Sequence, residues 1–405
     1  MRRDHRRPAA VLTALAALLA TTMTAAPGTG ALADEPCGLP RSAAVHHSLG
    51  LDSWNDDYPR PVGTVRAVML FLSFPDTEPR LSPGRIAEDY FPATTEYFDR
   101  SSYGRLSLET EVVEEWLEMP ADSVDYGIQR DWPAEQRADY LHDALSVIAP
   151  ATDLAAYDVV YLVADPDAPG VDSDATKVVN FNSPITVGEA EIRRLVTVFE
   201  NRRPDRNVLA HETGHVFDLP DLYNRPTEGS GDWDTHVGDW DLMGSQFGLA
   251  PDLFGWHKWK LGWLDPEHVA CVRSSGTSLH TLQPLGAPLD ERDPAADTRI
   301  AVVRTGPSEA LVAEARTPIG NDRSLCTRGV LLYRVRGDVA SAEGPVRVID
   351  GHPESDACHG TSVHPRLADA PLETGESYVD ASSGVRIEVG ERTSSGGWHI
   401  RVDKE

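Results

Sequence analysis

Cysteine, methionine and basic residues are all scarce in this chain of 405 residues. The four cysteines form no CxxC pair and no cluster with histidine, so the sequence excludes a structural zinc site of the zinc-finger type. Lys and Arg number 37 against 64 Asp and Glu, which gives a formal net charge of −27 at pH 7. Such an acidic surface argues against nucleic acid and anionic membranes as partners.

Long apolar runs are also missing, apart from one at residues 9–20. Four arginines precede this run, and the small residues after it end in Ala31-Leu32-Ala33, a cleavage site of the A-x-A type. The run is shorter than the roughly 18 residues that a membrane span requires. We therefore predict a secretory signal peptide over residues 1–33, no membrane anchor, and a secreted, extracellular protein.

An even number of cysteines in an exported protein predicts disulfide bonds. Cys326 and Cys358 both lie in the C-terminal third of the chain, so we pair them with each other. Cys37 and Cys271 then remain as the second pair.

The stretch at residues 207–223, NVLAHETGHVFDLPDLY, carries the clearest chemical pattern. His211 and His215 are four residues apart, so on a helix both imidazoles lie on one face and can bind the same Zn²⁺. Glu212, beside the first histidine, can then act as general base on a zinc-bound water. An HExxH pattern alone is moderately specific, and its surroundings decide its meaning.

A catalytic zinc site needs a third protein ligand besides the two histidines. Pro220 ends the predicted helix, and Asp221 follows ten residues after His211, where metzincin-type proteases (HExxHxxGxxH/D) carry this ligand. Those proteases have glycine at the turn, because the backbone there adopts φ > 0, whereas this chain has Asp218. We predict Asp221 as the third ligand and keep as alternatives Asn224, Glu228 and Asp232.

Two further features belong to the predicted site. Residues 240–245, WDLMGS, resemble the Met-containing turn of metzincins, in which a methionine forms an apolar floor beneath the zinc. An ordinary buried methionine in a tight turn is the alternative. A donor to the oxyanion of the tetrahedral intermediate is also needed, and the candidates are Tyr223, His236 and His257.

The remaining pattern predicts an α+β protein. After an extended arm at residues 34–64, we expect strands at 65–74, 102–113, 157–163 and 195–200, and helices at 82–98 and about 131–150. The strand at 195–200 is either an edge strand that pairs with an extended substrate or an interior strand. Short β-like runs after position 265 predict a β-sandwich-like domain at 266–405, behind a catalytic domain at 65–265.

An acidic loop lies between the third strand and the site. Its carboxylates are Asp165, Asp167, Asp172 and Asp174. Such a loop can bind a structural Ca²⁺, but it lacks the EF-hand spacing, and a solvated acidic loop is the favoured interpretation.

Several segments together resemble a known family. VMLFLSFPD, YFDRSSYGRLSLETEVVEEW, HETGHVFDLPDLY, WDLMGS and PDLFGWHKWKLGWL look like successive blocks of the immune inhibitor A-like secreted zinc metalloproteases (peptidase family M-six). They span about residues 65–264 in family order. The resemblance implies a zincin or metzincin-like catalytic domain, with His211 and His215 as zinc ligands and Glu212 as catalytic base. Family members often have Asp where this chain has Asn224.

The arm offers an alternative role for one cysteine. Residues 36–40, PCGLP, superficially resemble the cysteine switch of matrix metalloprotease propeptides, where a thiolate caps the zinc. The even cysteine count favours a disulfide instead.

These features predict a secreted, monomeric zinc endopeptidase that acts on protein or peptide substrates. Two alternatives remain. One is a secreted binding or adhesion protein on an inactive metalloprotease scaffold, which would bind zinc without turnover. The other is a metal-dependent hydrolase of non-peptide bonds.

Overall fold

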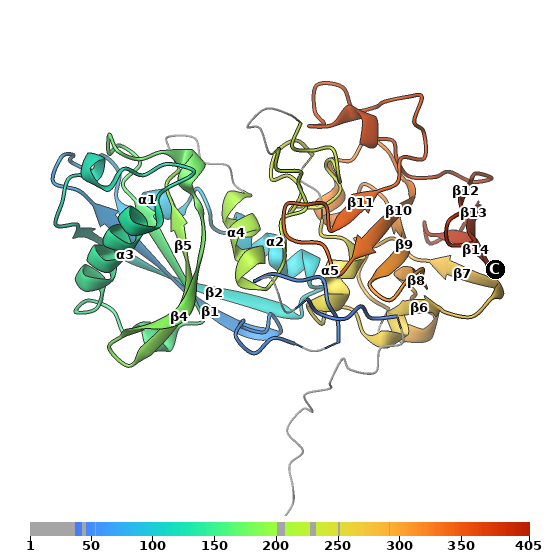
Figure 1. Cartoon of the computed structure of the whole chain (residues 1–405), viewed down its shortest axis with the longest axis horizontal. Coiled ribbons are helices and arrows are strands. Elements are labelled where there is room, and N and C mark those ends of the chain that lie inside the picture. Colours follow the sequence, from blue (N-terminus) through green and yellow to red (C-terminus); the bar gives the residue numbers. More distant parts are fainter. Residues whose placement is uncertain are drawn as a thin grey trace, which may run out of the picture. The chain divides into compact units, whose positions relative to one another are not determined.

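The computed structural model combines several sheets with few helices, which confirms the α+β class (Figure 1). The structure describes residues 37–42, 46–52, 54–200, 207–226, 232–249, 252–290 and 292–405. The predicted signal peptide and the first residues of the arm lie outside these ranges. None of the described helices is long and apolar enough to cross a membrane.

Five strands form the first sheet. They are β1 (Gly63–Ser73), β2 (Leu106–Glu118), β3 (Val159–Ala164), β4 (Lys177–Val187) and β5 (Ala190–Val198), in the spatial order β2-β1-β3-β5-β4. β1 is parallel to β2 and β3, and β3 is parallel to β5. β4 is antiparallel to β5 and forms one edge of the sheet.

The predicted strand at 195–200 is therefore interior, and its assignment as an edge strand is wrong. It corresponds to the end of β5, which lies between β3 and β4. The true edge strand, β4, is absent from the sequence prediction. Asn182, Ser183 and Pro184 interrupt its apolar alternation. Proline also cannot donate a hydrogen bond within a sheet, so its presence argues against a strand.

The two faces of this sheet carry different cores, because alternate residues of a strand point to opposite sides. From β1, Leu70 and Leu72 pack in one core with helix α3 (Ala134–Ile148), which covers that face (Figure 1). Met69 belongs to the core on the other face, together with the site helix α4 (Val208–Val216). The sheet thus supports α4 from behind.

The single helix predicted at 82–98 is wrong, because two helices occupy this region. α1 (Pro83–Ala87) is capped by the Ser82 side chain, and α2 (Ala93–Ser101) begins after Pro92. Proline lacks an N–H group and its ring clashes with the preceding turn of a helix, so a helix cannot continue through it without a break. Short 3₁₀ helices lie in the connections, at Ser123–Tyr126, Leu154–Ala156, Ser173–Ala175, Pro266–His268, Pro294–Ala296, Gly320–Asp322 and Pro365–Leu367.

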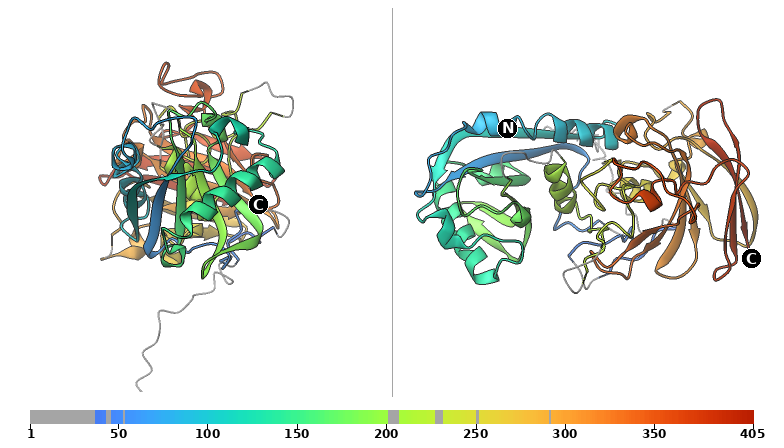
Figure 2. Two further views of the ribbon diagram at one scale, coloured as in Figure 1. Left: turned by 90° about the vertical axis from the view of Figure 1, so that its left-hand side faces the viewer. Right: turned by 90° about the horizontal axis from the view of Figure 1, so that it is seen from above.

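Two further sheets follow helix α5 (Gly255–Lys260). One contains β6 (Val269–Val272), β8 (Ile300–Arg304), β9 (Glu309–Arg316), β10 (Gly329–Arg336) and β11 (Val346–Val348), in the order β11-β10-β9-β8-β6. The other contains β7 (Gly276–Leu282), β12 (Ser377–Asp380), β13 (Val385–Arg392) and β14 (Trp398–Lys404), in the order β12-β13-β14-β7. The orange and red strands lie in two layers in the right-hand view of Figure 2.

The sheet that contains β8 contributes residues to two hydrophobic cores. Ala301 and Val303 of β8 face the second C-terminal sheet, whereas Ile300 and Val302 belong to the core that contains α4. Buried apolar contacts therefore continue across position 265, where the sequence predicts a domain boundary.

The predicted disulfide pairing is confirmed. Cys37 is bonded to Cys271 and Cys326 to Cys358. The cysteine-switch alternative is wrong, because Cys37 has no free thiolate with which to cap a metal. Leu39 of the arm is fully buried in the same core as α4, so the arm is an integral part of the fold.

Candidate metal centre

Three side chains that can bind a metal converge where α4 ends. The Nε2 atoms of His211 and His215 lie 3.3 and 3.0 Å from Oδ1 of Asp221. One ligand atom from each residue lies within 4.8 Å of the others, and no second such group of His, Cys, Asp or Glu occurs among the described residues. The structure thus brings the three predicted ligands together.

Both imidazoles are held in the orientation and tautomer that a metal requires. Nδ1 of His211 lies 2.9 Å from the Leu242 carbonyl oxygen, and Nδ1 of His215 lies 2.7 Å from the Leu219 carbonyl oxygen. A carbonyl oxygen can only accept, so each Nδ1 carries the proton and donates. In the neutral rings, the Nε2 lone pairs then face Asp221.

Asp221 is held just as firmly. Its backbone N–H donates to the Ser341 hydroxyl oxygen at 2.8 Å, and that hydroxyl group donates to Oδ2 at 3.1 Å. Oδ1 is buried and has no hydrogen-bond donor unless an imidazole is protonated. The serine therefore leaves one carboxylate oxygen free to face the two histidines.

This arrangement requires positive charge between the three ligands. Although burial lowers the pKa of His215, the neighbouring Asp221 carboxylate raises it to about 9. A divalent cation meets the same requirement, because it can take two imidazole lone pairs and the free Oδ1. The residues thus fit a zinc ion in type, number and tautomer.

The chain reverses at Asp218, immediately after the helix. Asp218 adopts φ +67°, the left-handed conformation for which metzincin-type proteases use glycine. Its fully buried carboxylate accepts hydrogen bonds from Lys260 Nζ at 2.7 Å and from Arg41 at 2.5 and 3.0 Å. This turn brings Asp221 back towards the histidines.

Glu212 lies next to the three ligands, with its side chain against the edge strand. Oε2 accepts a hydrogen bond of 2.6 Å from the Val178 N–H of β4. Burial raises the pKa of this carboxyl, and His215 and His211 partly offset that effect. A raised pKa suits a carboxylate that takes up a proton during the reaction.

Met243 lies directly beneath α4. A Cβ atom on Gly214 would stand 2.5 Å from the Met243 sulfur, so only glycine permits this approach. The Met243 carbonyl accepts from the Leu222 N–H at 2.9 Å, which joins the turn at 240–245 to the segment that carries Asp221. Met243 therefore packs against the helix that carries the two histidines, and its role as the floor of a metal site stays a prediction.

A cavity of about 1010 Å³ opens beside these groups. Its lining includes Glu212 and all three candidate ligands, together with Tyr223. Of the three oxyanion-donor candidates, only Tyr223 lines it, and burial together with the nearby Asp221 carboxylate raises the pKa of its hydroxyl. His257 is fully buried with Nδ1 2.9 Å from Oδ2 of Asp241, and His236 lies outside the lining.

The alternative third ligands lie elsewhere. The Asn224 side chain donates to the Asp232 carbonyl oxygen at 3.2 Å, and Oδ2 of Asp232 lies 3.0 Å from Nδ1 of His364. Glu228 is outside the described residues. Neither Asn224 nor Asp232 joins the converging group.

The acidic loop forms no converging group of three carboxylates among the described residues. Asp165 and Asp172 accept from backbone N–H groups two residues ahead, and Asp174 pairs with Arg130. These contacts place the carboxylates of the loop in turns and an ion pair, and a structural Ca²⁺ there stays a prediction.

Three residues near the centre are absent from the sequence prediction. Gly214 was within reach of sequence reasoning, because glycine is unfavourable inside a helix and signals a close contact. Ser341 and His47 lie 120 and 164 positions from Asp221 and His211, and no local pattern connects them with the motif.

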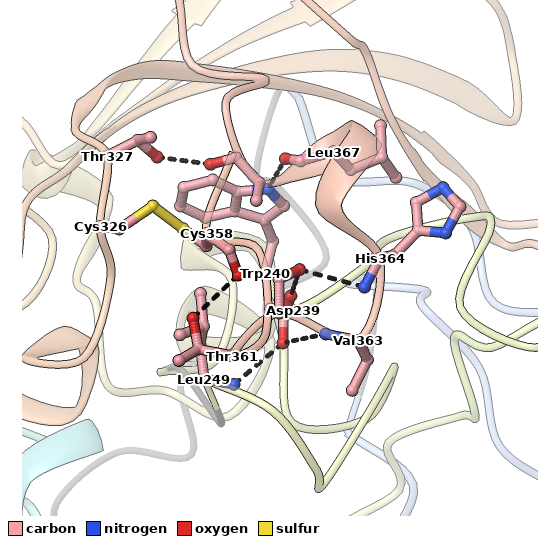
Figure 3. Close-up of a disulfide and its surroundings, with 12 residues drawn as sticks. Asp239, Trp240, Leu249, Cys326, Thr327, Cys358, Thr361, Val363, His364 and Leu367 are labelled. Carbon is pink, nitrogen blue, oxygen red and sulfur yellow. Dashed lines mark hydrogen bonds between the residues drawn. A yellow bond between two sulfur atoms is a disulfide. The ribbon is translucent and has the colours of Figure 1, made fainter. Parts of the chain in front are cut away.

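The segment at residues 358–367, called here the disulfide-anchored segment, contacts Asp239 and Trp240 at the start of the Met-containing turn (Figure 3). The Cys326–Cys358 bond anchors it, and the Trp240 indole N–H donates to the Leu367 carbonyl oxygen at 2.6 Å. Beside it, Asp239 accepts from the Val363 N–H at 3.3 Å. The carbonyl of Leu242, two residues beyond Trp240, is the group that orients His211, so this segment supports a metal ligand indirectly.

Comparisons with known proteins identify no family for this chain. No protein-family model matches it, and no curated protein matches it. Among solved structures, it is similar to wild-type OgpA from Akkermansia muciniphila, with a TM-score of 0.30 and 9% identity. The match covers 85% of this chain and 94% of that one.

Removing Asp221 tests the ligand assignment. We expect Asp221→Ala to lower zinc affinity by more than about 100-fold, since even residues that only orient a ligand cost 10–100-fold. Chelator competition measures the affinity. Asp232→Ala is the matched control and should bind zinc like the wild type; the reverse result would make Asp232 the ligand.

Replacing Asp218 tests whether its buried ion pairs stabilise the turn after α4. We expect Asp218→Gly to lose about 3–5 kcal/mol of unfolding free energy, although glycine suits φ > 0, because Lys260 loses its buried partner. Urea unfolding measures the loss. Adding Lys260→Met should restore part of it by removing the uncompensated charge. A stabilised Asp218→Gly variant would contradict this account.

The disulfide-anchored segment gives a third prediction. We expect the Cys326→Ser, Cys358→Ser double variant to lose about tenfold in zinc affinity, because the Met-containing turn loses support behind His211. The control is Ser355→Ala, three residues before Cys358 and with its side chain directed to Asp369. Unchanged affinity in the double variant would show that the segment has only a structural role.

Proposed function

We propose that this protein is a secreted zinc-dependent endopeptidase with a zincin or metzincin-like catalytic domain. The observation that carries the proposal is the convergence of His211, His215 and Asp221 beside the buried carboxyl of Glu212, in a cavity large enough for a peptide. The two disulfides support the secreted part of the proposal, because such bonds persist in oxidising compartments.

Each residue then has a defined task. His211, His215 and Asp221 would hold the zinc, which supplies Lewis acidity that polarises the scissile carbonyl and lowers the pKa of water towards about 7. Glu212 takes the proton of the attacking water and passes it to the leaving amine. The Tyr223 hydroxyl, at Asp221, is the proposed donor to the developing oxyanion.

Substrate would bind along the edge strand. β4 has a free edge beside Glu212, and an extended peptide can add to such an edge through main-chain hydrogen bonds. The Val178 N–H faces the cavity and bonds to Glu212 in this structure. We assign catalysis to residues 65–265 and stabilisation of the floor to residues 266–405.

A single substitution separates catalysis from metal binding. Glu212→Gln keeps the size of the side chain but cannot accept a proton, so we expect casein hydrolysis to fall by about 10²–10⁴-fold. Zinc content should remain one per chain, as measured by mass spectrometry of the metal. Val178 can still donate to the glutamine oxygen, so the fold should be retained.

Zinc content and hydrolysis, measured for the wild-type protein, distinguish the alternatives. Wild-type protein that binds no zinc would contradict the proposal. Zinc binding without turnover of any protein would favour a binding protein on an inactive scaffold. Failure to cleave a peptide library, with hydrolysis of another bond type, would favour a non-peptide hydrolase.

A further inference from the structure

One wall of the cavity comes from the N-terminal arm. The His47 ring packs on the ring of His215, with centroids 5.1 Å apart and planes tilted by 33°. His47 is 9% exposed and is the only described arm residue that lines the cavity. It stands beside the metal centre but is not one of the converging ligands.

A hydrogen bond joins the same ring to the edge strand. Nδ2 of Asn180, in β4, lies 3.2 Å from Nε2 of His47. Oδ1 of Asn180 accepts from Nε of Arg194 at 3.1 Å, so the other amide atom is the donor, and Nε2 of His47 accepts. His47 therefore spans the gap between α4 and β4.

The arm that carries His47 is firmly anchored. The Arg194 guanidinium lies 3.6 Å from the centroid of the Tyr58 ring, and the Tyr58 hydroxyl donates to the His46 carbonyl oxygen at 2.5 Å. Arg41 donates to the same carbonyl at 3.3 Å and to both carboxylate oxygens of Asp218. Displacing His47 would therefore disturb several buried contacts.

The lining of the cavity along β4 stops beside His47. It includes Lys177 and Val178 but not Val179 or Asn180, the residue that bonds to His47. Most of its other lining residues come from α4, from the segments before α3 and β4, from the segment after α4, and from residues 244–247. His47 thus forms a wall of the cavity beside the metal centre.

We propose that His47 determines which substrates the centre accepts, by closing the cleft on one side of the scissile bond. The proposal rests on the proposed peptidase function. An extended peptide advances about 3.3 Å per residue, so a wall packed on His215 leaves room for about one or two residues on that side. The other side of the cleft accepts a longer segment.

Two series of peptides of increasing length, called ladders here, test whether His47 closes one side of the cleft. In one, a cleaved core peptide is lengthened by one to four residues on the N-terminal side, and in the other on the C-terminal side. For the zinc-loaded wild type, kcat/KM should increase along one ladder and stop increasing after about two residues along the other. Continued gains along both ladders would overturn the proposal.

His47→Gly should open the closed side. With zinc content unchanged, we expect a gain of about tenfold in kcat/KM for the longest peptides of the series along which the wild type stops improving. The peptides of the other series should change little. His46→Ala is the matched control, since that side chain is exposed and adjacent. If folded, zinc-loaded His47→Gly protein shows the same dependence of kcat/KM on peptide length as the wild type, His47 does not close the cleft.

Binding separates this inference from the proposed function. The Kd of each peptide is measured with zinc-loaded Glu212→Gln protein, which does not require turnover. If the wild type cleaves no peptide but affinity still stops improving along one ladder, the peptidase proposal fails. The proposal that His47 closes one side of the cleft is then still supported. If affinity improves along both ladders, the wall is excluded regardless of activity.

Discussion

The buried carboxylate of Asp218 connects the parts of the protein on which the centre depends. It lies at the reversal after α4, in the left-handed conformation, and it is paired with Lys260 from α5 and Arg41 from the arm. Burial of unpaired charges costs several kcal/mol, so the three segments are mutually dependent. The turn places Asp221 opposite His211, and the arm places His47 in the wall of the cavity.

A second buried network holds the Met-containing turn from the C-terminal side. Arg316 of β9 is fully buried between Glu314 and Asp322, and it donates to the Trp240 carbonyl oxygen at 3.0 Å. Within the Met-containing turn, Asp241 accepts from the Met243 N–H at 2.8 Å. The C-terminal sheets therefore support the turn that orients His211, a candidate metal ligand, although their described residues contribute no converging ligand.

The chemical part of the centre was largely predictable from local sequence. Helical spacing placed His211 and His215 on one face, and the expectation that the helix ends soon after His215 allowed Asp221 to return to them. The predicted end at Pro220 is wrong, because the helix ends at Val216 and the chain reverses at Asp218. The departure from the glycine pattern at Asp218 was also interpretable, because aspartate tolerates φ > 0. The pairing of the four cysteines followed from their positions along the chain.

Other features required the folded chain. Pro92 divides a predicted helix, and β4, which the sequence did not predict, takes the edge position considered for the strand at 195–200. Ser341 and His47 reach the centre from distant segments. The sequence by itself determined the residue types and their spacing within one helix and turn, because those depend on local backbone geometry. Only the tertiary structure decided which strand borders the cavity, which charges pair with Asp218 and which residue of the arm lines the cavity, because those depend on packing between segments far apart in the chain.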